Sequence, residues 1–294
     1  MTTPMNPQMY RFAFFGTAPL AQEVLDALEA KGLVPSLIVA GKDRLARDKS
    51  IVFPVEKAWA TARGIPVVQP EAITPEFIDE LKTQEWDAFV VASYGKILPK
   101  ALLEIPKRGT INMHPSLLPK LRGPSPIRSA ILNDERETGV SVMLLDEKMD
   151  HGPLIGQRKV DVADWPPHGA TLDALLAREG GELLAEVLPQ WLAGEIAVVE
   201  QDHSQATYCK IFLKEEGELD LNADAYQNLL KIRAFEGWPG TFALFERGDQ
   251  RLRVVILDAH IEGKKLVIDT VKPEGKGAMP YADFLRSGPT PMRA

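Results

Sequence analysis

Short apolar runs alternate with helical patterns along the first two thirds of the chain. An apolar run over 11–15 is followed by four residues at the spacing of one helix face, Leu20, Val24, Leu25 and Leu28. A second apolar run covers 33–40. This order of strand, helix and strand predicts two parallel strands joined by a right-handed crossover. The pattern therefore predicts an α/β fold with an open, mostly parallel, Rossmann-like sheet.

Later segments extend the same sheet. Further strands are expected over 65–68, 88–92 and 139–145. The run at 88–92 is apolar throughout, which is typical of a strand buried on both faces. Helices are expected to begin near Pro54, Pro75 and Pro126, and a long helical pattern covers 172–192.

The character of the chain changes after this long helix. Beyond it, a helix over 223–234 and alternating strands over 240–245, 252–257 and 265–271 predict a smaller, mainly β domain that resembles an OB-like barrel. The predicted organisation is an α/β domain over 1–190, a linker over 191–206 with few core residues, and a β-rich domain over 207–294.

Composition and charge limit the class of protein. The formal net charge of −7 argues against a protein that coats nucleic acid over its whole surface. Positive charge is nevertheless concentrated between Lys96 and Arg128, where seven cations face only Glu104, and a second basic cluster spans 42–57. This distribution is compatible with a local anionic partner.

Targeting signals and cysteines point to the cytoplasm. No run of about 18 apolar residues occurs, so no membrane span is expected. Residues 1–9 carry no charge and are interpreted as a loose tail rather than a secretory signal. Cys209 is the single cysteine, which excludes an internal disulfide and favours a reducing compartment.

The segment 110–123 has the strongest pattern of candidate chemistry. Its first half alternates, so Asn112 and His114 are expected on one face of a strand, with Ile111 and Met113 on the other. Pro115 lacks an N–H group and should end regular pairing. By itself, this pattern fits either a plain polar strand end or a catalytic pair.

Two other loops are expected near this strand end. Residues 93–99 follow the apolar strand at 88–92, and ligands of open α/β sheets bind outside the carboxyl ends of the strands. Tyr94 in this loop either lines the crevice or covers the sheet edge. Asp150 lies in a glycine-containing turn that could fold against the end of the previous strand. Only one glycine, Gly16, follows the first strand, so a dinucleotide cofactor is not expected.

Asn112, His114 and Asp150 have complementary roles in an attack on a carbonyl. An imidazole can move a proton at neutral pH, and a carboxylate beside it orients the ring and favours its protonated form. An amide can donate to a developing oxyanion. The chain has no Gly-x-Ser-x-Gly motif, so direct attack by a nucleophile of the substrate is expected.

Two alternatives remain open at this point. His114, Asp150 and His151 are all potential metal ligands, but no HExxH motif or second Cys/His cluster supports a metal site, and no metal is expected. His151 could also replace His114 as the base, although the Asn-x-His pair favours His114.

These residues resemble the signature of the folate-dependent formyltransferases. The resemblance is carried by Asn112-x-His114-x-Ser116-Leu117-Leu118-Pro119-x-x-Arg122-Gly123 with Asp150 downstream. It extends to Phe15-Gly16-Thr17, Asp43-Arg44, Tyr94-Gly95-x-x-Leu98-Pro99 and Glu137-Thr138-Gly139-Val140. In the second domain, Ile232-Arg233-Ala234-Phe235, Trp238-Pro239-Gly240 and Gly275-Lys276-x-Ala278-Met279 resemble the family members that act on initiator tRNA.

The resemblance implies transfer of a formyl group from 10-formyltetrahydrofolate to the α-amine of methionine on initiator tRNA. It implies that Asn112, His114 and Asp150 are catalytic, and that the folate co-substrate contacts Ser116, Leu117, Leu118, Pro119, Tyr94, Gly95, Ile97 and Leu98. Arg44 would approach the acceptor end of the tRNA, and phosphate contacts would come from Arg233, Lys264, Lys265, Lys272 and Lys276. A cytoplasmic monomer is expected.

Three segments depart from the family pattern. The loop after Arg44 is short and lacks a glycine-rich run, the second domain is abbreviated between Leu257 and Lys272, and His151 stands where a small hydroxyl residue is more usual. Formyl transfer to a nucleotide-linked amino sugar shares the catalytic motif and remains an alternative. A catalytically silent RNA-binding protein is disfavoured because all three catalytic candidates are present.

Overall fold

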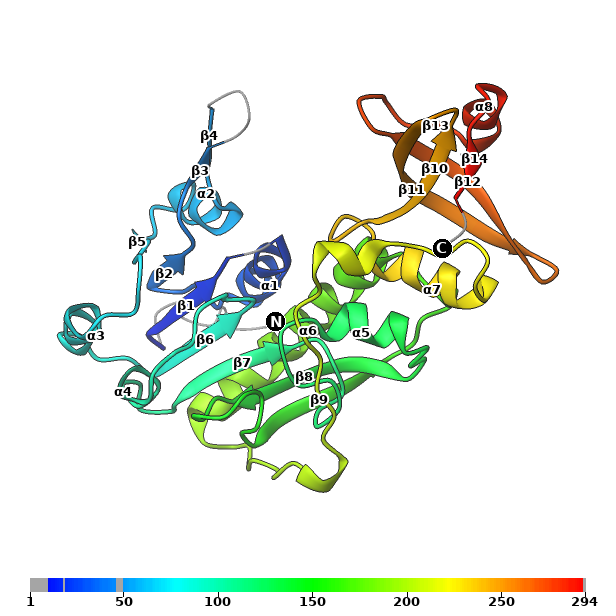
Figure 1. Ribbon diagram of the computed structural model, residues 1–294. Coiled ribbons are helices and arrows are strands. Elements are labelled where there is room, and N and C mark those ends of the chain that lie inside the picture. Colours follow the sequence, from blue (N-terminus) through cyan, green and yellow to red (C-terminus); the bar gives the residue numbers. More distant parts are fainter. Residues whose placement is uncertain (1–9, 18, 46–49, 293–294) are drawn as a thin grey trace. The chain divides into compact units, whose positions relative to one another are not determined.

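The computed structural model describes residues 10–17, 19–45 and 50–292 and divides into two compact units (Figure 1). The first unit comprises Met1–Gly123, Thr138–Asp161 and Ala174–Tyr208, and the second comprises Pro124–Glu137, Val162–Asp173 and Cys209–Ala294. The predicted domain boundaries stay a prediction. The predicted tail over 1–9 and residues 46–49 of the short loop lie outside the described residues.

The first unit is built on a seven-stranded sheet with the order β5-β2-β1-β6-β7-β8-β9 (Figure 1). Five strands are parallel: β1 (Phe12–Gly16), β2 (Leu37–Ala40), β5 (Val67–Val68), β6 (Ala88–Ala92) and β7 (Thr110–His114). Two antiparallel strands, β8 (Thr138–Leu144) and β9 (Leu154–Val160), extend the sheet beyond β7. The predicted mostly parallel α/β sheet is confirmed.

Helices cover both faces of this sheet. On one face, α3 (Pro75–Lys82) and α4 (Lys100–Leu103) pack with Phe15, Phe89 and Val91 in one apolar cluster. On the other face lie α1 (Pro19–Ala30) and α6 (Gly169–Ala193), where a Cβ added to Gly180 would come within 2.5 Å of the Met113 sulfur. This double cover explains why all five residues of β6 are buried.

Smaller elements of the first unit lie outside the sheet. Helix α2 (Val55–Thr61) packs on α1, and a two-stranded hairpin joins β3 (Arg44–Leu45) to β4 (Ile51–Val52). A 3₁₀ turn, η1 (His203–Gln205), follows in the segment that was predicted to be a linker. The hairpin places the predicted basic residue Arg44 on an exposed strand.

The second unit contains a five-stranded antiparallel sheet with the order β13-β12-β11-β10-β14. Its strands are β10 (Thr241–Arg247), β11 (Gln250–Glu262), β12 (Lys265–Pro273), β13 (Met279–Pro280) and β14 (Thr290–Pro291). Its helices are α5 (Pro126–Leu132), η2 (Lys214–Gly217), α7 (Ala225–Ala234) and α8 (Tyr281–Arg286). The predicted mainly β second domain is confirmed.

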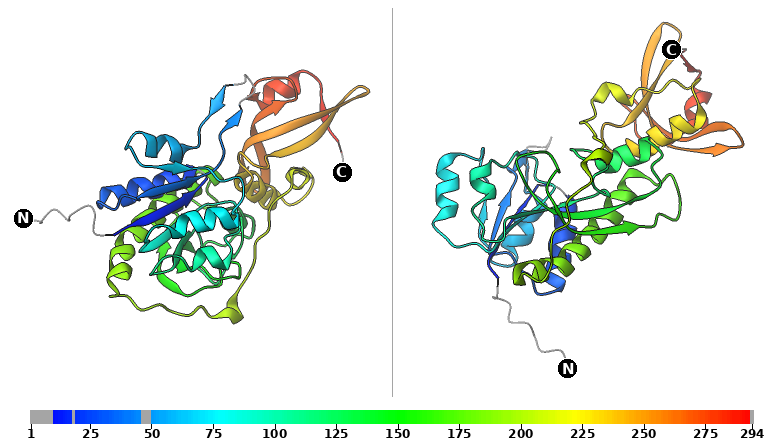
Figure 2. Two further views of the ribbon diagram at one scale, coloured as in Figure 1. Left: turned by 90° about the vertical axis from the view of Figure 1, so that its left-hand side faces the viewer. Right: turned by 90° about the horizontal axis from the view of Figure 1, so that it is seen from below.

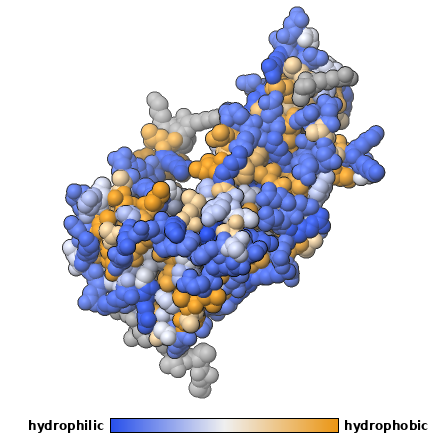
Figure 3. All heavy atoms as spheres, turned by 60° about the horizontal axis from the view of Figure 1, so that its bottom comes forward, coloured by the Kyte–Doolittle hydropathy of each residue, from blue (hydrophilic) through white to orange (hydrophobic). Residues whose placement is uncertain are grey.

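Strands β11 and β12 form one long hairpin, drawn in orange in Figure 2, which includes the segment where the chain is abbreviated. Hydrophilic residues cover most of the face shown in Figure 3, with apolar residues scattered between them. Within the described residues, no helix is both long enough and apolar enough to cross a bilayer.

Candidate active site

Strand β7 places Asn112 and His114 on the same face of the sheet. In the parallel register, Asn112 pairs with Val91 of β6, whose side chain belongs to the cluster under α3 and α4. Met113 points to the opposite face, against Gly180 of α6. This is the arrangement that the alternation in the sequence predicts.

The imidazole of His114 is held between a carbonyl and a carboxylate. The side chain is 5% exposed, Nε2 lies 3.0 Å from the Leu121 carbonyl oxygen, and Nδ1 lies 3.7 Å from Oδ2 of Asp150. A carbonyl only accepts hydrogen bonds, so Nε2 carries the hydrogen and Nδ1 faces the carboxylate. A proton taken up at Nδ1 would therefore form an ion pair with Asp150.

Asp150 reaches His114 because the loop after β8 folds back over the sheet. The end of β8, Leu144, pairs with Ile111, whereas His114 pairs with Ser141. The loop must therefore run back along β8 by about 10 Å, the length of three strand residues, to bring the Asp150 carboxylate to the His114 imidazole. Asp150 has a φ of +47°, and its Oδ2 accepts a 2.7 Å hydrogen bond from the Gly123 N–H.

Gly152 permits the close return of this loop. A Cβ added to Gly152 would lie 2.0 Å from the Leu144 carbonyl oxygen, inside the distance that any side chain tolerates. The Leu144 N–H also donates to the Pro153 carbonyl at 2.9 Å. The glycine that the sequence places beside Asp150 is thus required by a backbone contact.

The amide of Asn112 is available to a ligand. Asn112 is half-buried between buried neighbours on β7. Its side chain makes no hydrogen bond with any residue that the structure describes. An amide at this position can donate to an oxygen that enters beside His114.

The backbone of the loop after β7 is held by side chains of the neighbouring strands β8 and β9. The Ser141 hydroxyl donates to the Ser116 carbonyl at 2.7 Å and accepts from the Leu118 N–H at 3.1 Å. Gln157 of β9 donates to the Leu118 carbonyl at 2.8 Å. Ser116 and Leu118 are buried, whereas Leu117 and Pro119 are partly exposed. The accessible part of this loop therefore combines the apolar side chains of Leu117 and Pro119 with the exposed Lys120.

The loop after β6 presents a different surface. The Tyr94 ring packs edge-on against Phe15 with centroids 5.5 Å apart, and burial raises the pKa of its phenol to about 12. Gly95 is exposed, Ile97 is 91% exposed and Leu98 packs against the core cluster. The partly buried Tyr94 ring thus packs against the core cluster, and Gly95 and Ile97 are left exposed.

Sequence reasoning missed a cavity of about 380 Å³ along the loop that carries Asp150. Its walls include Leu103, Thr110, Leu144 and Leu145, with His151 at the loop. Gly109 and Thr110 lie at the start of β7, so the cavity lies toward the amino end of that strand, and its lining does not include Asn112, His114 or Asp150. Its volume falls in the range of small-molecule sites.

His151 has partners of its own. Its Nδ1 lies 2.7 Å from Oδ2 of Asp146, and its ring stacks on His203 with centroids 4.0 Å apart and planes at 9°. No group of three or more His, Cys, Asp or Glu side chains that could hold a metal ion occurs in the described part of the chain.

The predicted tRNA contacts differ in exposure. Arg44 and Lys276 are exposed, as are Lys264, Lys265 and Lys272. Arg233 has a side chain only 16% exposed, 3.4 Å from Asp258, and it donates to the Ala259 carbonyl at 3.1 Å. Its contact with tRNA stays a prediction.

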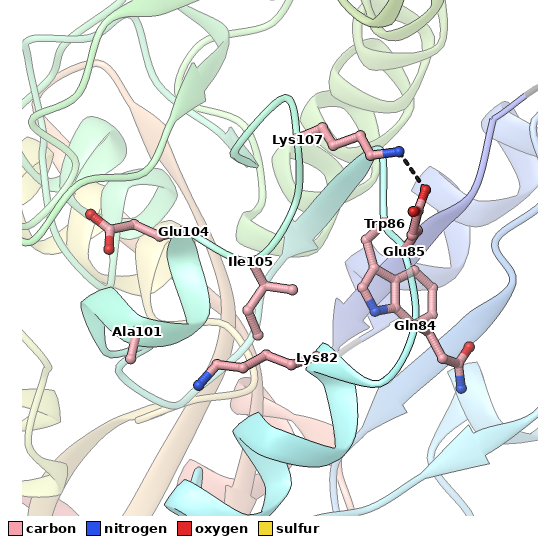
Figure 4. A pocket seen from close by; sticks show the side chains of 8 residues that line it. All are labelled: Lys82, Gln84, Glu85, Trp86, Ala101, Glu104, Ile105 and Lys107. Carbon is pink, nitrogen blue, oxygen red and sulfur yellow. Dashed lines mark hydrogen bonds and ion pairs between the residues drawn. The ribbon is translucent and has the colours of Figure 1, made fainter.

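A second cavity, of about 550 Å³, lies near the amino ends of β6 and β7 (Figure 4). It lies beside Trp86 and Lys107, which precede β6 and β7, whereas the catalytic candidates lie at and beyond the carboxyl end of β7. Lys107 is paired with Glu85 at 2.6 Å, and the Trp86 indole N–H donates to the Leu81 carbonyl. The charged and polar groups of this cavity thus have internal partners.

Comparison with known proteins identifies the family. The family described as formyl transferase matches residues 10–188. A methionyl-tRNA formyltransferase of Chloroflexus aggregans is 44% identical over 83% of this chain and 79% of its own length. That of Myxococcus xanthus is 36% identical over 94% of both chains. An N-formyltransferase from Helicobacter canadensis, solved with folinic acid and dTDP-3-aminofucose, has a TM-score of 0.63 and 18% identity, covering 88% of this chain and 99% of that one. This chain belongs to the formyl transferase family and, within it, to the methionyl-tRNA formyltransferases.

Proposed function

We propose that this chain transfers the formyl group of 10-formyltetrahydrofolate to the α-amine of methionyl initiator tRNA through Asn112, His114 and Asp150. The observation that carries this assignment is the approach of the His114 and Asp150 side chains, 3.7 Å apart and largely buried, beside the Asn112 amide, which has no hydrogen-bond partner among the described residues. The reaction is that of the methionyl-tRNA formyltransferases, and the geometry supports these three residues as the ones that carry it out.

The reaction forms a bond between the amine nitrogen and the formyl carbon and breaks the bond from that carbon to N10 of the folate. One proton leaves the amine, and one proton is required at N10. His114 takes up the amine proton at Nδ1, where Asp150 stabilises the charged ring. Asn112 donates to the formyl oxygen as negative charge develops on it.

The folate would lie between the loops after β6, β7 and β8. The partly exposed apolar residues Leu117, Pro119 and Ile97 offer surface for an aromatic ring system. Buried Ser116 and Leu118 would fix the shape of the loop after β7, and Tyr94 would fix the shape of the loop after β6. Gly95 and Leu98 would border the folate site.

The tRNA would be held by exposed cations of both units. Arg44 and Lys276 are the best candidates because their side chains are exposed and available to phosphates. Arg233 would act mainly by joining α7 to β11 through Asp258 and Ala259. We also propose a cytoplasmic location, because charged initiator tRNA is a cytoplasmic substrate; the monomeric state stays a prediction.

An acceptor assay tests the proposal. Purified protein is given 10-formyltetrahydrofolate with charged initiator tRNA in one reaction and with a nucleotide-linked amino sugar in another. Formylation of the tRNA alone is expected, with loss of most turnover in Asp150→Asn. Preferred formylation of the sugar would contradict the acceptor assignment, and full turnover in Asp150→Asn would contradict the catalytic one.

A further inference from the structure

We infer that Gln201 and Arg122 form a buried pair that positions Asp150 for catalysis, an inference that rests on the role proposed for Asp150. Arg122 is 1% exposed and Gln201 is 5% exposed. The guanidinium donates to Oε1 of Gln201 from Nη2 at 2.6 Å and from Nε at 3.2 Å. The amide nitrogen of Gln201 donates to the carbonyls of Asp150 at 3.0 Å and Gly152 at 2.7 Å.

These two contacts hold the backbone on both sides of His151. Asp150 adopts a φ of +47°, a conformation that is sparsely populated by residues other than glycine. Such a conformation persists only where its surroundings fix it. The Gln201 amide is the side chain that reaches both carbonyls of the turn, so it fixes where the Asp150 carboxylate points.

Arg122 lies between the two backbone groups that contact the catalytic side chains. The Leu121 carbonyl meets His114 Nε2, and the Gly123 N–H donates to Asp150 Oδ2. The Arg122 N–H donates to the Thr207 carbonyl at 2.9 Å, and the Thr207 hydroxyl accepts from the Leu121 N–H at 2.8 Å. Gln201, in the segment predicted to be a linker over 191–206, and Thr207, directly after it, thus hold the loop that orients both the imidazole and the carboxylate.

The pair also explains the unusual His151. Nη2 of Arg122 lies 2.8 Å from Nδ1 of His203, which therefore accepts the hydrogen bond. The His203 ring stacks on His151, and His151 contacts Asp146. An aromatic ring at 151 connects the turn to the Arg122 side chain through this stack, which a small hydroxyl residue could not do.

One substitution can separate the contact that the Gln201 amide oxygen accepts from the contacts that its amide nitrogen donates. Gln201→Glu keeps an acceptor for Arg122 but removes the donor to the Asp150 and Gly152 carbonyls. We expect the variant to fold and kcat to fall by about 10- to 100-fold, because a misplacement near 1 Å costs on that order. The KM for the folate should stay within about threefold, since Gln201 contacts the backbone of the turn and not Leu117, Pro119 or Ile97, the residues proposed to hold the ring system.

A variant that combines Asp150→Asn with Gln201→Glu provides the decisive measurement. If Gln201 acts through Asp150, Asp150→Asn combined with Gln201→Glu should be no slower than Asp150→Asn alone. Asn228→Asp is the matched control, because it removes another buried amide donor, 2.8 Å from the Asp220 carbonyl in the second unit. Asn228→Asp should lower the melting temperature about as much as Gln201→Glu does, but its kcat should stay near that of the wild type. Gln201→Asn, shorter and uncharged, tests the same contact if Gln201→Glu does not fold.

The possible failures are distinguishable. Near-normal kcat in Gln201→Glu beside an inactive Asp150→Asn overturns the positioning role and leaves the proposed function standing. A further loss in the double variant also overturns it, because a general structural defect would act through groups other than Asp150. Full turnover in Asp150→Asn itself removes the role of Asp150 and the inference with it.

Discussion

The side-chain amide of Asn112 is poised to donate, because it is half-buried on β7 and makes no hydrogen bond with the described residues. We predict that Asn112→Asp lowers kcat by about 100- to 1000-fold, since a carboxylate of nearly the same shape cannot donate to an oxyanion. Single-turnover formylation and direct measurement of folate affinity check this, and the affinity should change little.

Asn133→Asp is the control for this substitution. Asn133 is exposed at the end of α5, and its side-chain amide donates to Oε1 of Glu135 at 3.1 Å. Its turnover should stay within about twofold of the wild type, as is usual for surface substitutions. Equal turnover of Asn112→Asp and Asn133→Asp would remove Asn112 from the mechanism.

The Tyr94 hydroxyl gives a prediction about stability and pH. The hydroxyl is buried without a hydrogen-bond partner among the described residues, and burial raises its pKa to about 12. Below pH 10 the phenol is neutral in both the folded and unfolded states. Between pH 10 and 12 the unfolded chain loses a proton that the folded chain keeps, so the free energy of unfolding falls as the pH rises.

Tyr94→Phe removes this effect. At pH 7 the free energy of unfolding should be unchanged or slightly higher, because an unpaired buried hydroxyl is lost. At pH 11 the free energy of unfolding of the variant should exceed that of the wild type by up to about 1 kcal/mol. A fully buried phenol would give a larger difference, but Tyr94 is partly exposed. Urea unfolding at both pH values measures the difference, and an equal decline of the two proteins above pH 10 would contradict the prediction.

Local patterns predicted the catalytic candidates but not the residues that hold them. Asn112 and His114 are recognisable because strand alternation places them together, and Asp150 because a glycine turn follows a strand. Arg122 and Gln201 are 79 residues apart, and Gln201 lies in a segment with no apolar periodicity. A contact of this kind depends on the tertiary fold and leaves no local signal.

At the scale of elements, the loop after β8 depends on the close contact at Gly152. We predict that Gly152→Ala moves this loop, because the added Cβ would lie 2.0 Å from the Leu144 carbonyl oxygen. The expected result is a loss of 1–3 kcal/mol in the free energy of unfolding, on the order typical of overpacking, with a fall in kcat. Gly277→Ala is the matched control, because no described atom lies within 4 Å of a Cβ added there. The free energy of unfolding of this variant should be unchanged.

Elements with a continuous pattern were predicted, and those without one were missed. Strand β6 is apolar throughout, and α6 repeats leucines at helical spacing over 25 residues. Strand β9 reads Leu-Ile-Gly-Gln-Arg-Lys-Val, which breaks the alternation. Its Arg158 is half-buried because Glu186 of α6 pairs with it at 2.7 Å. A strand that meets a charged helix face cannot be found from apolar periodicity.

At the scale of the whole molecule, an acidic protein must bind a polyanion through local positive charge. The net charge of −7 would repel tRNA at long range, so the exposed cations have to act at contact distance. Arg44 meets this requirement because it stands on the exposed β3–β4 hairpin.

We predict that Arg44→Ala raises the KM for methionyl-tRNA and leaves the KM for the folate unchanged. Loss of one phosphate contact should also lower the slope of log KM for tRNA against log salt concentration by about 0.7–1, because one fewer counterion is released. Lys31→Ala is the control. Lys31 is exposed directly after α1, which starts at the carboxyl end of β1, so Lys31 lies at the opposite edge of the sheet. An unchanged salt slope in Arg44→Ala, or an equal change in Lys31→Ala, would show that the hairpin does not contact the tRNA backbone.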